Sequence, residues 1–195
     1  MSPAIIEAAA KKDIGLIAAG YLEAIDFRLT DKPRFIDKLP ENFLYLGFIA
    51  RAFPEAHMIH LRRNAMDACF AMYKQSFFKY AYTLENVGRY YVAYDRLYRH
   101  WAEVLQDRMI EVEYESLVAD AEGQTRILLD KLGLGFEQAC LDFDQNRTPS
   151  ATASAVQVRE KVHTRSVGKW KHFSSQLQTL KDYLEKAGIA VDPAK

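Results

Sequence analysis

The spacing of apolar and polar residues along the chain predicts helices that alternate with shorter strands. The helices are expected at residues 3–28, 41–53, 67–78, 83–106, 122–132 and 174–188. Segments with strand character are residues 34–39, 56–63 and 109–118. This order is typical of an α/β domain with a parallel sheet covered by helices.

One long stretch, residues 146–170, follows neither pattern and is rich in Thr, Ser and Arg. Its length without periodicity predicts a functional or mobile loop. Its end, "RSVGKWK", places Arg165, Lys169 and Lys171 around Ser166 and Gly168. We call residues 165–170 the basic loop. Glycine allows close backbone approach, and hydroxyl, N–H and cationic groups suit a phosphate clamp. A basic turn before a helix is the alternative.

Composition narrows the classes of protein. The chain has 195 residues and 49% hydrophobic content, which fit a globular domain with a core. Its 26 acidic and 26 basic residues balance, so a general nucleic-acid binder is disfavoured. No apolar run approaches the ~18 residues of a membrane span. Without a secretion signal, and with Cys69 and Cys140 expected as buried free thiols, a cytoplasmic location is predicted.

Charged and aromatic residues stand at the ends of the predicted strands. In open parallel sheets, ligands bind beyond the carboxyl ends of the strands. The residues at these ends are Asp37 and Lys38, Arg62 and Arg63, and Tyr114. Their convergence at one edge would suit an anion with a sugar or base attached.

The two adjacent arginines also allow a simpler interpretation. Arg62 and Arg63 would pair with Asp67 or Glu55 as surface charges. Spacing alone does not separate this alternative from an anion site.

Other chemistries have weak support in the sequence. The five histidines lack a metal-binding spacing, and no cysteine accompanies them. No serine lies in a Gly-x-Ser-x-Gly turn. No P-loop or dinucleotide fingerprint is present, so a nucleotide kinase is disfavoured.

Four segments together resemble the C-terminal two-thirds of bacterial sulfotransferases. They are "FIDKLPENFLYLGFIARAFPEAHMIHLRRNAMDACFAMYKQSF", "RYYVAYDRLYRHW", "IEVEYESLV" and "TASAVQVREKVHTRSVGKW". The branch is similar to tyrosylprotein sulfotransferases, which are often fused to tetratricopeptide repeats. The resemblance implies a P-loop-like α/β fold. It also implies transfer of a sulfuryl group from 3′-phosphoadenosine 5′-phosphosulfate to a hydroxyl or amine.

The resemblance also implies roles for individual residues. Arg63 would bind the 3′-phosphate of the donor, and Tyr114 would lie near the nucleotide. Lys38 would steady charge on the transferring group, and Arg159 would assist. The basic loop would fold over the 3′-phosphate and adenine through Arg165, Ser166, Gly168 and Lys169.

Two departures from the family pattern are visible. Ala71 stands where the family has a serine that contacts the 3′-phosphate. Residues 1–33 contain neither the first strand with its Pro-Arg-Ser-Gly-Thr loop nor the following helix with an acidic base. We therefore expect an N-terminal helical segment (1–33) and a partial, truncated sulfotransferase-like domain (34–190) that lacks the first, central strand.

Two functions stay open at this point. In the first, the chain is a sulfotransferase by descent that is impaired or needs a missing segment. Alternatively, it is a non-catalytic interaction protein or one half of a split enzyme, pairing with a P-loop-bearing chain or with a second copy. The sequence leaves the acceptor open.

Overall fold

The computed structural model describes residues 3–75, 79–145 and 161–192. The α-helices are α1 (Pro3–Ala10), α2 (Ile14–Ile25), α3 (Leu46–Ala52), α4 (Ala65–Tyr73), α5 (Leu84–Leu105), α6 (Tyr114–Ala119), α7 (Ala121–Lys131) and α8 (Gln178–Lys186). Short 3₁₀ helices are η1 (Asp26–Arg28), η2 (Pro40–Tyr45), η3 (Lys79–Ala81), η4 (Gln106–Arg108), η5 (Gln138–Cys140), η6 (Phe143–Gln145) and η8 (Lys169–Phe173).

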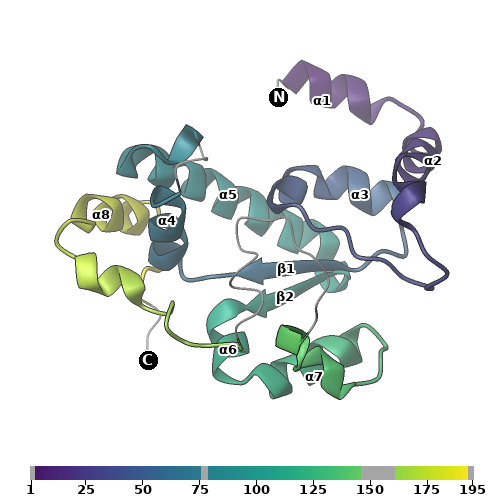
Figure 1. Ribbon diagram of the computed structural model, residues 1–195. Coiled ribbons are helices and arrows are strands. Elements are labelled where there is room, and N and C mark those ends of the chain that lie inside the picture. The colour runs from purple at the N-terminus through teal and green to yellow at the C-terminus, as the bar shows by residue number, and fades with distance from the viewer. Residues whose placement is uncertain (1–2, 76–78, 146–160, 193–195) are drawn as a thin grey trace. The chain divides into compact units, whose positions relative to one another are not determined.

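The described strands are β1 (Met58–Arg62) and β2 (Met109–Glu113), which form a two-stranded parallel sheet (Figure 1). The prediction of an α/β fold is therefore confirmed, in a mostly helical form. Both strands run in the same direction, so α4 and α6 begin at the same end of the sheet (Figure 1).

The predicted strand at 34–39 is wrong, because these residues have no regular secondary structure. Phe35 is 51% exposed and Ile36 is 90% exposed, so neither of these adjacent apolar side chains is buried. The predicted strand at 109–118 is too long. It ends at Glu113, and α6 begins at Tyr114.

The chain divides into two compact units. Unit 1 comprises Met1–Met58 and Leu97–Met109, and unit 2 comprises Ile59–Arg96 and Ile110–Lys195. The apolar cluster of unit 1 consists of Leu46, Ala50, Met58 and Leu105, with Phe43, Ile49, Trp101 and Met109 packed against it. The indole N–H of Trp101 donates to the Phe43 carbonyl at 2.9 Å. A Cβ at Gly47 would lie 2.6 Å from the Trp101 ring, so this close approach requires glycine.

The core of unit 2 joins α4, α5 and α8. Its fully buried members include Met66, Cys69, Val87, Leu180 and Leu184. Helix α8 ends in a Schellman motif, in which the N–H groups of Gly188 and Ile189 donate to Glu185 and Leu184. This turn brings Ile189 and Val191 into the same core.

Both cysteines are free thiols, as predicted, but only Cys69 is buried, whereas Cys140 is exposed. Burial raises the pKa of the Cys69 thiol, which keeps it protonated and unreactive. Within the described ranges, no helix has the length and apolar character needed to cross a membrane.

Candidate functional site

The carboxyl ends of β1 and β2 are joined by a hydrogen bond between the segments that follow them. The backbone N–H of Asn64, just after β1, donates to the Glu115 carboxylate at the start of α6, at 3.0 Å. The Asn64 side chain accepts from the backbone N–H of Asp67 at 3.1 Å, so it caps α4. The same side chain donates to the Val191 carbonyl at 2.9 Å. The turn after β1 is thus fixed from three directions.

Arg63 lies in this fixed turn, and its guanidinium contacts two of the other predicted site residues. Its Nη2 donates to the Ser166 carbonyl at 2.5 Å, and its Cζ lies 4.8 Å from the centre of the Tyr114 ring. Its Nε is buried and has no hydrogen-bond acceptor among the residues that the structure describes. A buried guanidinium N–H without an acceptor fits an anionic ligand such as a phosphate.

The basic loop is held against the first turn of α4 by Asp67, whose side chain is almost fully buried. The Asp67 carboxylate accepts from Gly168 N–H at 2.6 Å and from Trp170 N–H at 3.1 Å. Gly168 has φ +69, a left-handed conformation that favours glycine. Trp170, at the start of η8, is buried in the core of unit 2. Sequence reasoning treated Asp67 as a cap or an ion-pair partner and missed this contact. The available signal was a lone acidic residue in the apolar segment "AMDACF".

The cations of this segment all lie at the surface. Arg165 and Lys169 are exposed, and Ser166 and Gly168 are half-buried. Lys171, which the sequence grouped with the two cations, is also exposed and pairs with Asp192 at 2.9 Å.

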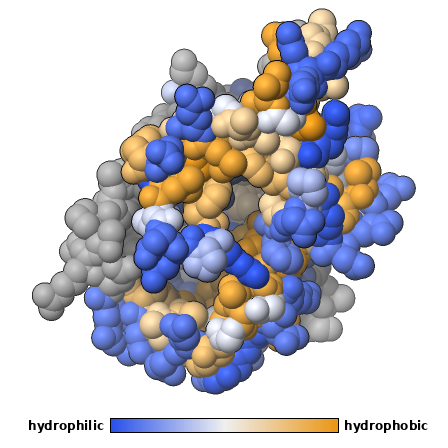
Figure 2. All heavy atoms as spheres, turned by 90° about the vertical axis from the view of Figure 1, so that its right-hand side faces the viewer, coloured by the Kyte–Doolittle hydropathy of each residue, from blue (hydrophilic) through white to orange (hydrophobic). Residues whose placement is uncertain are grey.

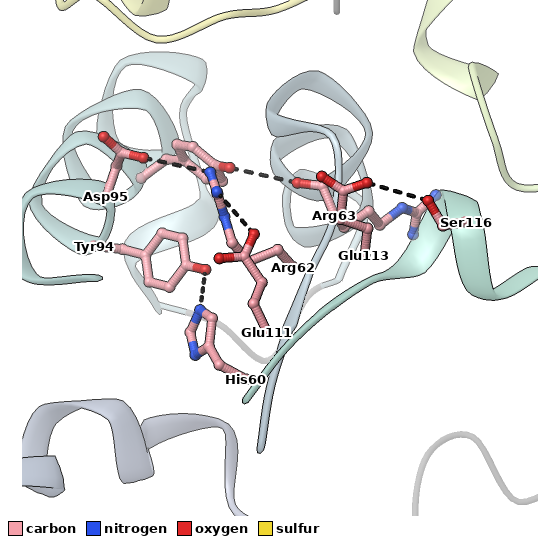
Figure 3. A network of polar contacts seen from close by, with 9 residues as sticks. His60, Arg62, Arg63, Tyr94, Asp95, Glu111, Glu113 and Ser116 are labelled. Atoms are coloured by element: carbon pink, nitrogen blue, oxygen red, sulfur yellow. Dashed lines mark hydrogen bonds and ion pairs between the residues drawn. The ribbon is translucent and has the colours of Figure 1, made fainter. Parts of the chain in front are cut away.

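Arg62 points to the other side of the turn and belongs to a polar network between the sheet and α5 (Figure 3). Its guanidinium contacts Glu111 at 3.2 Å and Asp95 at 3.7 Å. These acids, rather than the predicted Asp67 or Glu55, are its ion-pair partners. In the same network, His60 Nε2 lies 2.8 Å from the Tyr94 hydroxyl.

Burial sets the protonation of this network. Desolvation lowers the pKa of His60, with a raising effect from Glu111 and a lowering one from Arg62. Burial also raises the pKa of Tyr91, whose hydroxyl donates to the Arg63 carbonyl at 3.5 Å. Both groups are therefore neutral at neutral pH. The protonated Tyr91 hydroxyl can therefore donate to the Arg63 carbonyl.

Lys38 and Arg159 are not brought to this site by the described contacts. Lys38 is an exposed residue of unit 1, whereas Arg63, Tyr114 and the basic loop belong to unit 2, so its role stays a prediction. Arg159 lies outside the described residues. Beside Lys38, Asp37 accepts from the Tyr21 hydroxyl and from Asn42. Burial, followed by this hydrogen bond, raises the pKa of Tyr21 to about 12.

Comparison with known proteins adds independent information. The model of the sulfotransferase family matches residues 4–138, a range that contains Lys38, Arg63 and Tyr114 and ends before the basic loop. An uncharacterized protein of Aquifex aeolicus (strain VF5) is 31% identical over 172 residues, which are 85% of this chain and 23% of that protein. The chain thus spans less than a quarter of that relative. The division into 1–33 and 34–190 stays a prediction. With more than half of its residues matched by the family model, the chain belongs to the sulfotransferase family.

Proposed function

We propose that this protein is a sulfotransferase that uses 3′-phosphoadenosine 5′-phosphosulfate as the sulfuryl donor and a hydroxyl or amine as the acceptor. Family membership supports the reaction class. The described chain would supply the part of the donor site that binds the adenosine 3′,5′-bisphosphate end. Adenosine 3′,5′-bisphosphate is also the product that is left when the sulfuryl group has been transferred.

One observation carries the proposal. The Arg63 guanidinium lies against the Tyr114 ring and the basic loop, and its buried Nε has no acceptor among the described residues. A planar guanidinium can make paired, charge-assisted hydrogen bonds to a phosphate. We assign the 3′-phosphate to Arg63, with Arg165, Ser166, Gly168 and Lys169 covering it and Tyr114 beside the nucleotide. Arg159 would assist.

The other end of the donor requires groups beyond this cluster. Sulfuryl transfer, like phosphoryl transfer, depends on preorganised donors around the charge that develops in the transition state. Lys38 is our candidate for one of them. The sequence contains no Gly-rich loop to supply the rest. We therefore propose that this chain binds the nucleotide and that transfer needs further groups from a segment or partner chain.

A second candidate is a non-catalytic interaction protein. Unit 1 exposes large apolar side chains, with Leu16 at 73%, Phe27 at 78% and Ile36 at 90% exposure. Hydrophobic residues are also visible among hydrophilic ones on the face seen in Figure 2. A partner that covers these side chains would remove their apolar surface from water, which is favourable. Size-exclusion chromatography with light scattering distinguishes the candidates, since a stable monomer counts against the second.

The proposed site is tested by isothermal titration with adenosine 3′,5′-bisphosphate and with adenosine 5′-phosphate, which lacks the 3′-phosphate. The Arg63→Ala variant should bind the bisphosphate about 10- to 100-fold more weakly than wild type, because charge-assisted hydrogen bonds are lost. Its affinity for adenosine 5′-phosphate should change much less. The preference for the bisphosphate would therefore collapse.

Arg126→Ala is the matched control. Arg126 is also an arginine of unit 2 that stacks on an aromatic ring, with its Cζ 3.7 Å from the centre of Phe136. This variant should bind both nucleotides as wild type does. Identical titration curves for wild type and Arg63→Ala would show that the assignment of Arg63 is wrong.

A further inference from the structure

Asp67 is the only buried carboxylate among the described residues whose oxygens both accept from the basic loop. It is 2% exposed, and its partners lie 101 and 103 residues further along the chain. We propose that Asp67 is a positioning residue that holds the basic loop in the shape needed to bind the 3′-phosphate of the donor. This inference deepens the proposed function and rests on it.

The chemistry of the contact explains why it fixes the loop. An ionised carboxylate only accepts hydrogen bonds, and Gly168 and Trp170 supply two backbone donors to it. Hydrogen bonds to a charged acceptor are roughly twice as strong as neutral ones. If the loop moved away, a buried charge would lose both partners, which is strongly unfavourable. The conformation seen here is thus the one that satisfies Asp67.

The contact also determines where Arg63 points. Arg63 lies in the turn after β1 and Asp67 in the first turn of α4, which Asn64 caps, and both reach the basic loop. Arg63 donates to Ser166, and Asp67 accepts from Gly168, two residues later. The two contacts are coupled, because Ser166 and Gly168 are two residues apart in one loop. A displacement of Gly168 would therefore also move the Ser166 carbonyl. Arg63 would then lose the acceptor that orients its guanidinium.

The carboxylates of Asp67 and Glu115 already accept hydrogen bonds from backbone N–H groups. Asp67 faces two N–H groups of the loop, and Glu115 accepts from the backbone N–H of Asn64. With these partners in place, neither carboxylate needs a donor that a phosphate would otherwise use.

The test uses Asp67→Asn, which keeps the shape but replaces one acceptor oxygen by an NH₂ donor. Only one of the two loop amides can then be satisfied. Hydrogen exchange at Gly168 and Trp170 should become about 10- to 100-fold faster than in wild type, because a charge-assisted contact is lost. Binding of adenosine 3′,5′-bisphosphate should weaken about tenfold or more for the same reason. The preference over adenosine 5′-phosphate should persist in part, since Arg63 remains.

Asp95→Asn is the matched control. Asp95 is also a buried aspartate of unit 2, at 6% exposure, but it faces Arg62 rather than the loop. Both variants should lose stability, whereas only Asp67→Asn should change exchange at the two loop amides and nucleotide binding. Equal changes in both variants would reduce Asp67 to a general structural role and overturn the proposal.

A second variant and two further outcomes separate a failure of this inference from a failure of the proposed function. If Asp67→Asn does not fold, Asp67→Glu keeps the charge with a longer side chain, and the same measurements apply to it. Wild-type exchange at Gly168 and Trp170 in the folded variant would overturn the inference without any ligand. Failure of wild type to bind the bisphosphate, combined with faster exchange in the variant, would instead overturn the proposed function.

Discussion

Residues 63–67 with 166–170 in unit 2, and residues 14–39 in unit 1, both mix apolar side chains with a few charges. In the first region Asp67 is 2% exposed and Trp170 4%. In the second, α2 has no buried residue, and Ile36 is 90% exposed. Apolar character alone therefore does not produce burial. Whether a segment is buried depends on the elements packed against it.

The polar contacts of the two regions differ in the same way. Asp67 binds groups more than 100 residues away, so the basic loop is fixed by the tertiary structure. In residues 14–39, the contacts include the Asp13 cap of α2 and the bond between Tyr21 and Asp37, 16 residues apart. Substitutions should accordingly have large effects in the first region and small effects in the second.

The largest effect is expected for Trp170→Ala. Removing a buried tryptophan should lower the free energy of unfolding by about 3–5 kcal/mol, because burial is lost and a cavity remains. Urea denaturation followed by circular dichroism measures it. Phe35→Ala, at a 51% exposed position of unit 1, should change the same quantity by less than about 0.5 kcal/mol. Comparable losses in the two variants would remove the contrast between the regions.

A smaller effect is expected for Gly168→Ala. The left-handed conformation at φ +69 should make alanine less stable by about 1–2 kcal/mol. Gly133→Ala is a matched control, because Gly133 has φ +64 and open space around its Cβ position. Both should show similar losses in denaturation, but only Gly168→Ala should weaken binding of adenosine 3′,5′-bisphosphate. Weaker binding in both variants would mean that the effect is not specific to the basic loop.

The smallest effect is expected for Ile36→Ser. This side chain is 90% exposed, so the free energy of unfolding should change by less than about 0.5 kcal/mol. Denaturation at two protein concentrations is the measurement. A loss above about 1.5 kcal/mol that depends on concentration would instead indicate that another molecule covers this side chain in solution.

The parts of the fold that were predicted correctly depend on local patterns. Helical spacing predicts α5, and a short apolar run predicts β1. Residues 34–39 were mistaken for a strand because a short segment with apolar residues forms a strand only where a neighbouring strand pairs with its edge. The extension of β2 into α6 has a related cause, since "EYESLV" fits either state until Glu115 meets the turn after β1.

Only some of the contacts among the candidate site residues could be predicted. The rule that ligands bind beyond the strand ends selects Arg63 and Tyr114, and the Arg63 guanidinium does lie against the Tyr114 ring. The resemblance adds the basic loop, whose Ser166 carbonyl accepts from Arg63. The contacts of Asp67 with this loop could not be predicted, because its partners are remote in the sequence and its local position suggested a helix cap.

The distance between Asp67 and Gly168 in the sequence has a consequence for synthesis of the protein. A ribosome adds about 5–20 residues per second, so Gly168 emerges roughly 5–20 s after Asp67. Throughout that interval the nascent chain carries an acidic side chain that will later be buried, without its final partners. The contact between Asp67 and the basic loop therefore forms only after α4 and α5 have been made.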